Sequence, residues 1–541
     1  MKHHVRLFTP IMAACATLSL SSGAMAQTMT VSPSGIGTPD KVQSHLGTME
    51  YKDGVPASAT VQAAYDNLDF MHAVQVYLNA FAGVSTYAIR EGFLSIGAED
   101  NQIVIFPRLM DSKSVFLTAN ADTVYFVGIL DLTKGPMVLE APPESLGTLD
   151  DMWFNWIIDF GTPGPDRGIG GKYLVLPPGY TGPLPEGGFY VAQSRTSRAL
   201  ILGRAFVVNN DPKPAVEQIQ RTLKIYPYAP GGVGTSIAEI LTGAVKPGRN
   251  VEPPPVRYID ASGKSFNTVP PSDFGFYELL NKLVQDEPND ALDDVERMGQ
   301  MASIGIVKGK PFEPDARMRK ILTDAAAVGE ATSRTLVYRP RESEGFAVYP
   351  GSTWINPLWV GGYTMETPPP MVTRTGIEPF PPTGARTLNA RTAMFYYATG
   401  ITPAMIMRLP DIGSQYLMAF EDSEKHDFDG GKTYKVMLPP NVPAAKFWSF
   451  TVYDNQTRSM LQTPQAYPRA GSQSYPSPAA AANADGSTTI YFGPELPAGV
   501  QRGNWIQTVP GKGWNTILRL YSPLEPFFTK AWRPSEIELV Q

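Results

Sequence analysis

Six polar residues flank or interrupt strand-like runs that are otherwise apolar, and they are the residues best placed to do chemistry. A buried charge needs a partner, because an isolated one destabilises a fold by several kcal/mol. Each of these residues therefore either pairs structurally or lines a pocket. The six are Asp122, Arg204, Asp454, Arg458, Asn504 and Arg519.

Two acids in this group, Asp122 and Asp454, could divide acid and base work between them, as paired carboxylates do in glycoside hydrolysis. Tyrosine and arginine groups would assist them. The predicted catalytic set is Asp122, Tyr125, Arg204 and Asp454. The predicted ligand-binding set is Tyr453, Asn504, Trp505 and Arg519.

The stretch FWSFTVYDNQTRSML, residues 447–461, also has a purely structural interpretation, which we favour. Asp454 and Asn455 form turns readily because their side chains hydrogen-bond their own backbone. Arg458 can reach back to a carboxylate or a carbonyl. We therefore expect Asp454 mainly to stabilise a turn after an apolar strand.

Aromatic residues near glycines and prolines give a second set of candidates. On an exposed sandwich face such side chains suit stacking on sugar rings or holding apolar ligands. In a buried strand they are ordinary core residues. The residues concerned are Trp354, Trp359, Tyr363, Trp448, Tyr453, Trp505 and Trp514.

A metal site is not expected. Only His45, His72 and His426 follow the first 26 residues, and no HExxH motif occurs. His72 suits a structural role on a helix, one turn after Asp69. The acidic run 421–430 does not fit an EF-hand, so a solvated hairpin at Asp429-Gly430 is favoured over another kind of calcium site.

Several function classes are disfavoured by missing motifs. The chain has no nucleophile elbow, no phosphate-binding loop and no dinucleotide fingerprint, so we expect no cofactor. Its mild net negative charge of -6 and the absence of a basic run argue against nucleic acid. If the protein is an enzyme, we expect a metal-independent hydrolase or lyase.

The first 26 residues resemble a signal peptide. Lys2 and Arg6 precede an apolar stretch, and Ala24-Met25-Ala26 forms a cleavage site before Gln27. Cleavage there would remove Cys15, the single cysteine; lipidation of Cys15 is the alternative. We therefore expect a periplasmic or secreted protein, free of cysteine and disulfides, without a transmembrane segment.

The 51 prolines and 49 glycines punctuate short β-branched and aromatic runs, a pattern typical of β-sandwiches. Apolar spacing becomes helical near residues 59–82 and again from 272 to 330. The expected organisation has six parts. They are a signal peptide (1–26), an extended arm (27–58), an N-terminal helix with a β domain (59–226), a connector (227–255), a helical module (256–345) and a C-terminal β domain (346–541).

Long motifs within these parts resemble a known bacterial family. FWSFTVYDNQTRSML, NADGSTTIYFGPELP and NWIQTVPGKGWNTILRLYSP resemble domain of unknown function 1214. NADTVYFVGILDLTKGPMVLEAP, GKYLVLPPG and the segment around Arg204 resemble its usual companion, domain of unknown function 1254, and GIVKGKPFEPD fits proteins that carry both. The chain departs from the family at Ala119-Asn120-Ala121-Asp122, where Pro-Asn-Asn-Asp is commoner. The resemblance implies an immunoglobulin-like sandwich, a helical middle and a C-terminal jelly roll, and it supplies no activity.

Two functions stay open at this level. One is an exported enzyme that acts on a carbohydrate or another small organic substrate through carboxylate, tyrosine and arginine groups. The other is a non-catalytic ligand-binding or envelope-associated protein. Two carboxylates in one cleft would favour the enzyme, whereas acids dispersed in separate ion pairs would favour binding. The sequence does not indicate an oligomeric state.

Overall fold

The computed structural model describes residues 36–230, 232, 237–243, 253–288, 295–362, 365, 371–373, 376–378, 383, 385–400, 402–406 and 408–540. The expected signal peptide 1–26, Gln27 and parts of the connector 227–255 lie outside these ranges. The chain divides into two compact units, Met1–Asp66 and Asn67–Gln541. Within the described ranges, no helix has the length and apolar character needed to cross a membrane.

The first unit contains a small antiparallel sheet where we expected an extended arm. Its strands are β1 (Lys41–Ser44), β2 (Gly47–Lys52) and β3 (Val55–Pro56). The Thr60 hydroxyl accepts from the Glu50 amide at 2.9 Å and donates to the Glu50 carbonyl at 3.1 Å, which ties β2 to the start of α1 (Ser58–Ser95). These strands are short and mostly exposed. Because they have no buried face, their sequence does not alternate between apolar and polar residues.

The second unit begins with two sheets packed on one core. The six-stranded sheet has the order β14-β4-β6-β12-β8-β9, and the four-stranded sheet has the order β11-β10-β7-β13. Strand β6 supplies Val124 and Phe126 to the core between the sheets and Val127 to the opposite face. The stretch DTVYFVGILDL is apolar at successive positions, which predicts a central strand with two buried faces. The structure confirms this prediction.

The bounds of these strands follow. The six-stranded sheet contains β4 (Ile103–Ile105), β6 (Thr123–Asp131), β8 (Ser145–Asp151), β9 (Trp156–Gly161), β12 (Arg198–Phe206) and β14 (Tyr258–Asp260). The four-stranded sheet contains β7 (Met137–Ala141), β10 (Gly171–Leu176), β11 (Tyr190–Gln193) and β13 (Lys224–Pro227). Helix α2 (Lys213–Thr222) precedes β13, and β5 (Ser114–Val115) pairs with β15 (Phe266–Asn267).

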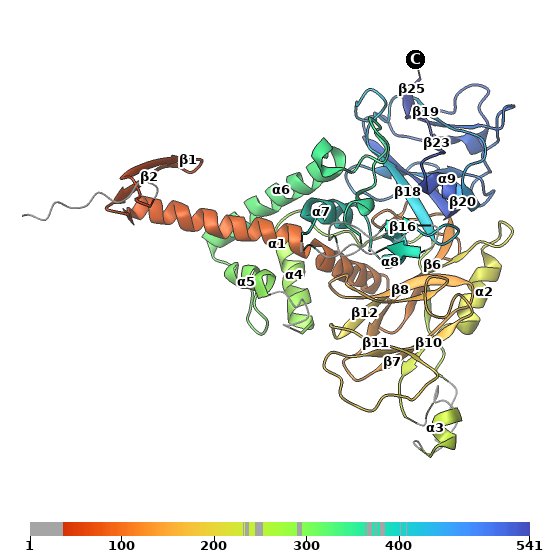
Figure 1. The fold of residues 1–541 in the computed structure, drawn as a ribbon, viewed down its shortest axis with the longest axis horizontal. Helices are drawn as coiled ribbons and strands as arrows, with labels where there is room; N and C mark the ends of the chain where they lie inside the picture. The colour runs from red at the N-terminus through yellow and green to blue at the C-terminus, as the bar shows by residue number, and fades with distance from the viewer. Residues whose placement is uncertain are drawn as a thin grey trace, which may run out of the picture. The chain divides into compact units, whose positions relative to one another are not determined.

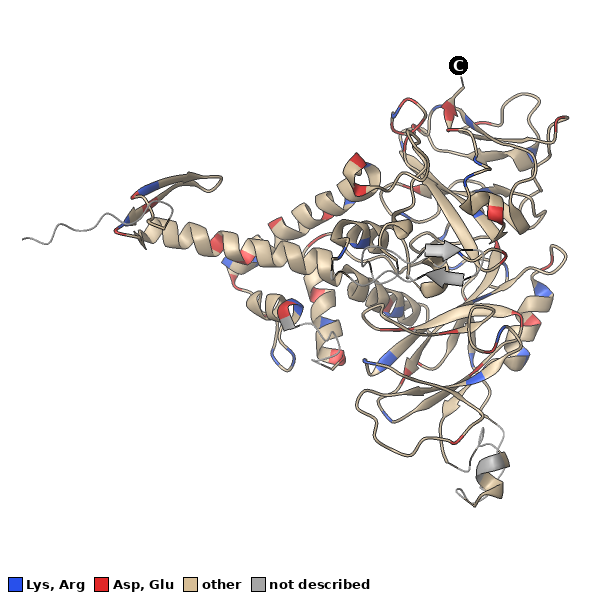
Figure 2. Cartoon of the chain, viewed as in Figure 1, with Lys and Arg blue, Asp and Glu red and all other residues tan. Residues whose placement is uncertain are grey.

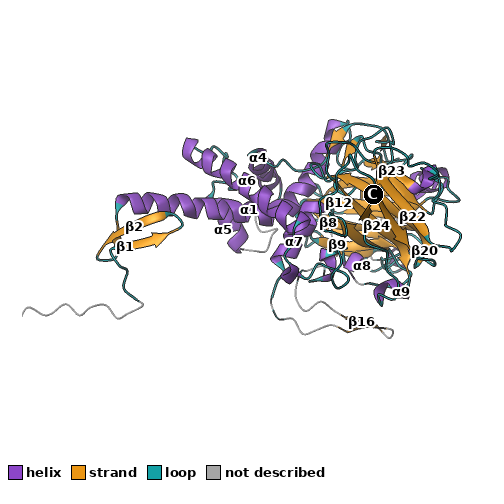
Figure 3. Ribbon diagram, turned by 90° about the horizontal axis from the view of Figure 1, so that it is seen from above, coloured by secondary structure: helices purple, strands orange, loops and turns teal. Residues whose placement is uncertain are grey.

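Helices dominate the middle of the chain, as the apolar spacing predicts. They are α4 (Gly275–Asp286), α5 (Val295–Ser303) and α6 (Ala316–Tyr338), after a short α3 (Ile237–Leu241). Asp315 follows Pro314 just before a helical pattern, which predicts a helix N-cap. The structure confirms it, because Asp315 accepts from the Met318 amide at 2.7 Å at the start of α6. Within the second unit, Figure 3 shows α4, α5 and α6 close to α1 and apart from the large sheets.

Two further sheets form the C-terminal part of the second unit. Their orders are β18-β24-β20-β21 and β23-β22-β19-β25. The alternation in WNTILRLYS predicts that Leu518 and Leu520 share one face of a strand and Ile517 the other. In the structure Leu518 and Leu520 of β24 enter the core between the two sheets, whereas Ile517 faces the other side. The strands are β18 (Ser414–Ala419), β19 (Tyr434–Leu438), β20 (Ala444–Asp454), β21 (Arg469–Gly471), β22 (Thr488–Gly493), β23 (Trp505–Gln507), β24 (Trp514–Pro523) and β25 (Glu538–Leu539).

The fold is rich in β-sheet and has a helical middle, but helices and strands cross the expected boundaries. Helices α7 (Leu388–Tyr397), α8 (Pro403–Ile406) and α9 (Glu525–Phe528) lie in the segment 346–541 that we assigned to a β domain. Strands β14 and β15 lie in the segment assigned to the helical module. Strands β16 (Met371–Thr373) and β17 (Gly376–Glu378) pair with each other. Figure 1 shows α7 and α8 next to β18.

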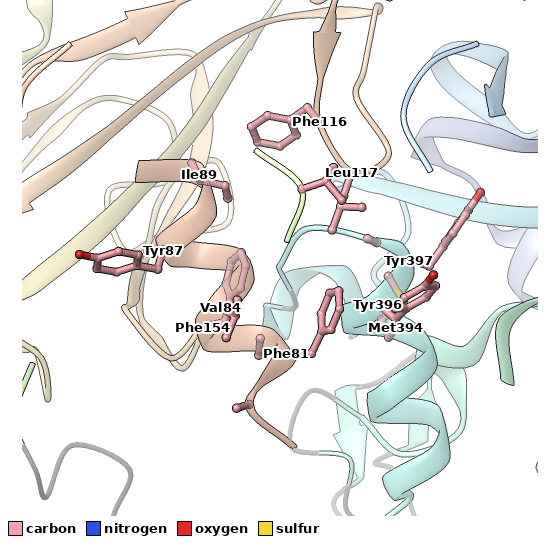
Figure 4. Close-up of a cluster of buried hydrophobic side chains, with 14 of the residues drawn as sticks. Phe81, Val84, Tyr87, Ile89, Phe116, Leu117, Phe154, Met394, Tyr396 and Tyr397 are labelled. Carbon is pink, nitrogen blue, oxygen red and sulfur yellow. The ribbon is translucent and has the colours of Figure 1, made fainter. Parts of the chain in front are cut away.

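A large apolar core joins the helices to the sheets. In Figure 4, Phe81 of α1 lies near Tyr396 of α7, and their ring centroids are 5.3 Å apart. Phe154 and Met394 belong to the same core. The aromatic run Phe395-Tyr396-Tyr397 packs against this core from helix α7.

Candidate functional site

A cavity lies between the six-stranded sheet and the sheet that contains β18 and β24. Its floor comes from one face of the six-stranded sheet. Arg204 on β12 pairs with Tyr125 on β6 and with Leu146 on β8. Leu202 pairs with Thr148, which pairs with Asp159 on β9. Residues directly opposite each other in antiparallel strands share a face, so all six side chains lie on this floor.

The opposite wall comes from the C-terminal sheet. Tyr416 on β18 pairs with Arg519 on β24, and Met418 pairs with Ile517 in the next same-face row. Segments 116–120 and 398–405 contribute further residues to the lining. The cavity has a volume of about 140 Å³. An engineered apolar cavity of about 150 Å³ holds benzene, so this one accommodates a similarly small ligand.

Arg204 is a buried cation that faces hydroxyl groups. Its guanidinium donates to the Ser414 hydroxyl at 2.9 Å and to the Tyr125 phenol oxygen at 3.3 Å. It also lies 5.6 Å from the centre of the Tyr521 ring. Arg204 is only 9% exposed, yet no ion pair joins it to a carboxylate within the described ranges. Its charge is therefore solvated by neutral groups alone.

Arg519 is a second buried cation in the same cavity. Its Nη2 donates to the Thr118 carbonyl at 3.0 Å, and its guanidinium lies 5.6 Å from the centre of the Tyr453 ring. Its Nη1 is buried and has no hydrogen-bond acceptor among the residues described. Arg519 is 3% exposed and, like Arg204, forms no ion pair with a carboxylate of the described chain.

Asp159 supplies a carboxylate to the cavity lining. Burial raises the pKa of Asp159 to about 6, although hydrogen bonds from Trp156 and Thr148 oppose the shift. Burial and the carboxylates of Asp151 and Asp159 also raise the pKa of neighbouring Asp150 well above its usual range, which favours its neutral form. Asp159 is thus the acid of this cavity, and no motif in the sequence pointed to it.

Asp122, the first predicted catalytic acid, is held in a complete set of structural contacts. It accepts from Arg469 Nε at 2.7 Å, and the side chains of both residues are fully buried. The Ser449 hydroxyl and the Tyr521 phenol also donate to it, at 2.6 and 2.9 Å. Burial, followed by this carboxylate, raises the pKa of Tyr521 well above its usual range, so its phenol stays a neutral donor.

Asp454, the second predicted acid, lies at a turn and not in the cavity. Its Oδ1 accepts from the Gln456 amide at 2.6 Å, and its Oδ2 pairs with Lys512. Arg458 reaches back to this turn as expected, donating to the Gln456 carbonyl at 3.5 Å. It also lies 3.7 Å from Glu330 and stacks 3.8 Å above the Tyr396 ring. The two acids thus occupy separate ion pairs.

The loop after β20 attaches the helices to the C-terminal sheets. Arg334 of α6 donates to the Asn455 carbonyl at 2.8 Å and to the Gln456 carbonyl at 3.0 Å. The Tyr338 phenol donates to the Asn455 carbonyl at 2.9 Å. These contacts support the favoured structural interpretation of the stretch 447–461, because its turn binds the C-terminal part of helix α6.

Replacing Asp454 by alanine should lower the free energy of unfolding by about 0.5–2 kcal/mol, as loss of a side-chain cap does. The reason is that the Gln456 amide loses its acceptor. Urea unfolding followed by tryptophan fluorescence measures the change, and Asp454→Asn, which keeps an acceptor, should lose less. If Asp454→Ala unfolds like wild type, Asp454 does not stabilise the turn.

Asn504 and Trp505 also have structural surroundings outside the cavity. The Asn504 amide donates to the carbonyls of Ala481 and Thr489 at 2.9 and 2.8 Å, and Trp505 donates to the Gly493 carbonyl at 2.9 Å. Tyr453 is buried and donates to the Ala119 carbonyl at 2.7 Å. Of the predicted ligand-binding set, Arg519 alone lines the cavity.

The aromatic set is mainly core. Trp354, Trp448 and Trp514 belong to the C-terminal hydrophobic core, and Trp359 packs against it. Tyr363 lies outside the described residues. The ligand-facing interpretation is therefore wrong for the three core tryptophans, because their rings fill the space between the two C-terminal sheets.

Histidines and acidic residues have ordinary partners. His72 Nδ1 lies 2.9 Å from the Ser303 hydroxyl, and His45 is exposed. His426 lies 3.7 Å from Asp422. Arg339 pairs with both Glu421 and Asp427 of the acidic run. Within the described part of the chain, no three His, Cys, Asp or Glu residues are grouped as metal ligands.

Two family models match the sheet regions that form the floor and the opposite wall of the cavity. The model described as "Protein of unknown function (DUF1254)" matches residues 101–227, and the model described as "Protein of unknown function (DUF1214)" matches residues 413–525. This chain pairs the two domains of unknown function, 1254 and 1214. The first contains Tyr125, Asp159 and Arg204, and the second contains Tyr416 and Arg519, so the cavity needs both domains.

Solved structures with low sequence identity also resemble the chain. The crystal structure of the VPA0106 protein from Vibrio parahaemolyticus is 18% identical, with a TM-score of 0.47; the match covers 87% of this chain and 100% of that one. A crystal structure of an uncharacterized protein from Burkholderia cenocepacia is 12% identical, with a TM-score of 0.35, and the match covers 90% and 97%. No curated protein matches the chain.

Proposed function

We propose that this protein binds a small organic anion in the cavity between its two domains. The observation that carries the proposal is the pair of buried guanidinium groups, Arg204 and Arg519, that face one cavity without carboxylate partners in the described chain. A bound anion would complete their hydrogen bonding. This favours the ligand-binding alternative over the enzyme that acts through Asp122 and Asp454.

An anion is favoured because a buried cation without a counter-ion is unstable in a low-dielectric interior. Arginine stays charged at physiological pH, so neither group can avoid this cost by losing its proton. Arg519 lines the cavity, and its buried Nη1 has no acceptor among the described residues. Carboxylates match the planar fork of a guanidinium and often bind it through two hydrogen bonds.

The remaining lining restricts the body of the ligand. Most of it is apolar, with Phe116, Leu117, Leu202, Met394 and Met405 among the contributing residues. A cavity of about 140 Å³ suits a ligand about as large as benzoate or hexanoate. The expected ligand is therefore a short carboxylic acid with an apolar body.

Thermal unfolding of the wild-type protein with paired probes tests this function. Hexanoate and benzoate should raise the melting temperature, because a ligand that binds only the folded state stabilises it. Their neutral isosteres hexanamide and benzamide should raise it much less. Equal stabilisation by each acid and its amide would contradict anion binding, as would no stabilisation by short carboxylates of any shape.

Catalysis by Asp159 is the second candidate, favoured by the pKa of about 6 that burial gives this cavity acid. A carboxyl group with a raised pKa can exchange a proton near neutral pH, as acid–base catalysts do. It would fit the metal-independent hydrolase or lyase expected from sequence. Conversion of a bound ligand by wild type but not by Asp159→Asn, followed by proton NMR, would favour this candidate.

We further propose an immunoglobulin-like sandwich for the first domain, a jelly roll for the second, and export of the mature chain. Paired sheets of mostly antiparallel strands in each domain support the two folds. Residues 1–26 support export through their basic start, apolar stretch and small residues before Gln27. A protein with a periplasmic or secreted location would meet small organic anions from outside the cell.

A further inference from the structure

Asp159 and Arg204 lie at different ends of the cavity floor. Asp159 is on β9 and Arg204 is on β12, with β8 between them. Across β8, Asp159 is aligned with Leu202 on β12, and Leu202 is two residues before Arg204 on that strand. Strand spacing of about 4.8 Å and a rise of about 3.4 Å per residue put their Cα atoms about 12 Å apart. The floor therefore presents a cation at one end and an acid at the other.

The charges of the lining limit the charge of the ligand. Arg204 and Arg519 contribute two positive charges and an ionised Asp159 contributes one negative charge, so the lining has one excess positive charge. Asp122 lies near Arg519 but is already neutralised by Arg469. A monocarboxylate balances the excess, whereas a dicarboxylate would reverse it. A zwitterion would leave it unbalanced in a buried site.

We propose that the ligand is a hydroxy-substituted monocarboxylate, with its carboxylate at Arg204 and Arg519 and its hydroxyl donating to Asp159. This inference rests on the proposed function and adds a second contact point to it. A carboxylate has several lone-pair positions, so Asp159 can accept from a ligand while it accepts from Thr148 and Trp156. A plain fatty acid would leave this acceptor buried against an apolar chain.

Calorimetric titration at pH 8 with matched acids tests the inference. The probes are butanoate, hexanoate and octanoate, each compared with its ω-hydroxy derivative, together with adipate and 6-aminohexanoate. At least one hydroxy acid should bind wild type about tenfold more tightly than its parent, as expected for one hydrogen bond to a charged group. Adipate and 6-aminohexanoate should bind more weakly than that hydroxy acid.

Variants at position 159 assign the preference to this side chain. Asp159→Leu should abolish the hydroxyl preference and keep the binding of the parent acid, because it removes the acceptor and a like charge. Asp159→Asn keeps the size and an acceptor, and it provides a second test if the leucine variant does not fold. Asp131→Asn, on β6 of the same sheet but outside the cavity lining, is the matched control and should bind like wild type.

The outcomes separate this inference from the function on which it rests. If no short carboxylate binds, the proposed function itself fails. If parent acids bind and no hydroxy derivative binds more tightly, the function stands and the role of Asp159 is wrong. A preference for hydroxy acids that survives in both Asp159→Leu and Asp159→Asn would also overturn that role, as would adipate binding most tightly.

Discussion

Replacing Arg469 by methionine should lower the free energy of unfolding by about 3–5 kcal/mol, the usual consequence of removing one partner of a buried ion pair. The substitution leaves the Asp122 carboxylate without its charged partner in a fully buried position. The Ser449 and Tyr521 hydroxyls remain as donors but carry no balancing charge. Urea unfolding followed by tryptophan fluorescence measures the loss.

Two controls show whether the ion pair causes this effect. Asp122→Leu/Arg469→Met removes both charges and should recover most of the stability, because an apolar pair can replace a buried ion pair at little cost. Arg519→Met removes a cation that has no carboxylate partner, so it should change the stability by less than about 1.5 kcal/mol, the value of one hydrogen bond. An Arg469→Met variant as stable as wild type would contradict the structural role of Asp122.

The second large effect is on ligand affinity. Arg204→Met/Arg519→Met should weaken hexanoate binding by about 100-fold or more, because each charge-assisted hydrogen bond contributes about 1.5–3 kcal/mol. Either single variant should lose about tenfold. The methionine side chain keeps much of the apolar volume of arginine, so the cavity keeps its shape while it loses charge.

Calorimetry gives these affinities, and two variants serve as controls. Arg221→Met, at an exposed position in the last turn of α2, should bind hexanoate like wild type. Arg204→Lys keeps the charge but loses the planar fork, so it should bind more weakly than wild type and more tightly than Arg204→Met. If the double methionine variant retains wild-type affinity, the anion does not bind at these guanidinium groups.

The order of helices and strands was predictable, because the spacing of apolar residues along the sequence differs between the two. The two faces of DTVYFVGILDL placed β6 inside a sandwich, and the alternation in WNTILRLYS placed Leu518 in a core and Arg519 on the opposite face. The Asp315 cap was equally local, because its acceptor serves an amide three residues away. Features that depend only on residues close together in the sequence could therefore be predicted.

Helices α7 and α8 and the partners of the predicted acids were not predictable in the same way. Asp122 pairs with Arg469, which is 347 residues away, and no local pattern links the two. Asp159 appeared as one polar residue in an ordinary strand, WIIDFG. Its importance comes from the row that it shares with Thr148 and Leu202 across three strands. The signal available in sequence was a single acid in an apolar strand, the same signal that identified Asp122.

Pairing of the two domains follows from the same geometry. The cavity takes Arg204 from the first domain and Arg519 from the second, and the buried pair of Asp122 and Arg469 also joins these domains. Neither domain alone would enclose the cavity. The proposed binding site therefore depends on both domains.

The most direct test of the account is a thermodynamic cycle between the ligand charge and the Arg519 charge. Calorimetry should compare hexanoate with its neutral isostere hexanamide, each bound to wild type and to Arg519→Met. The account predicts that wild type prefers hexanoate at least about tenfold, as one charge-assisted hydrogen bond provides, and that Arg519→Met largely loses this preference. A preference for hexanoate that is unchanged in Arg519→Met would contradict the claim that this cavity binds an anion through its unpaired arginines.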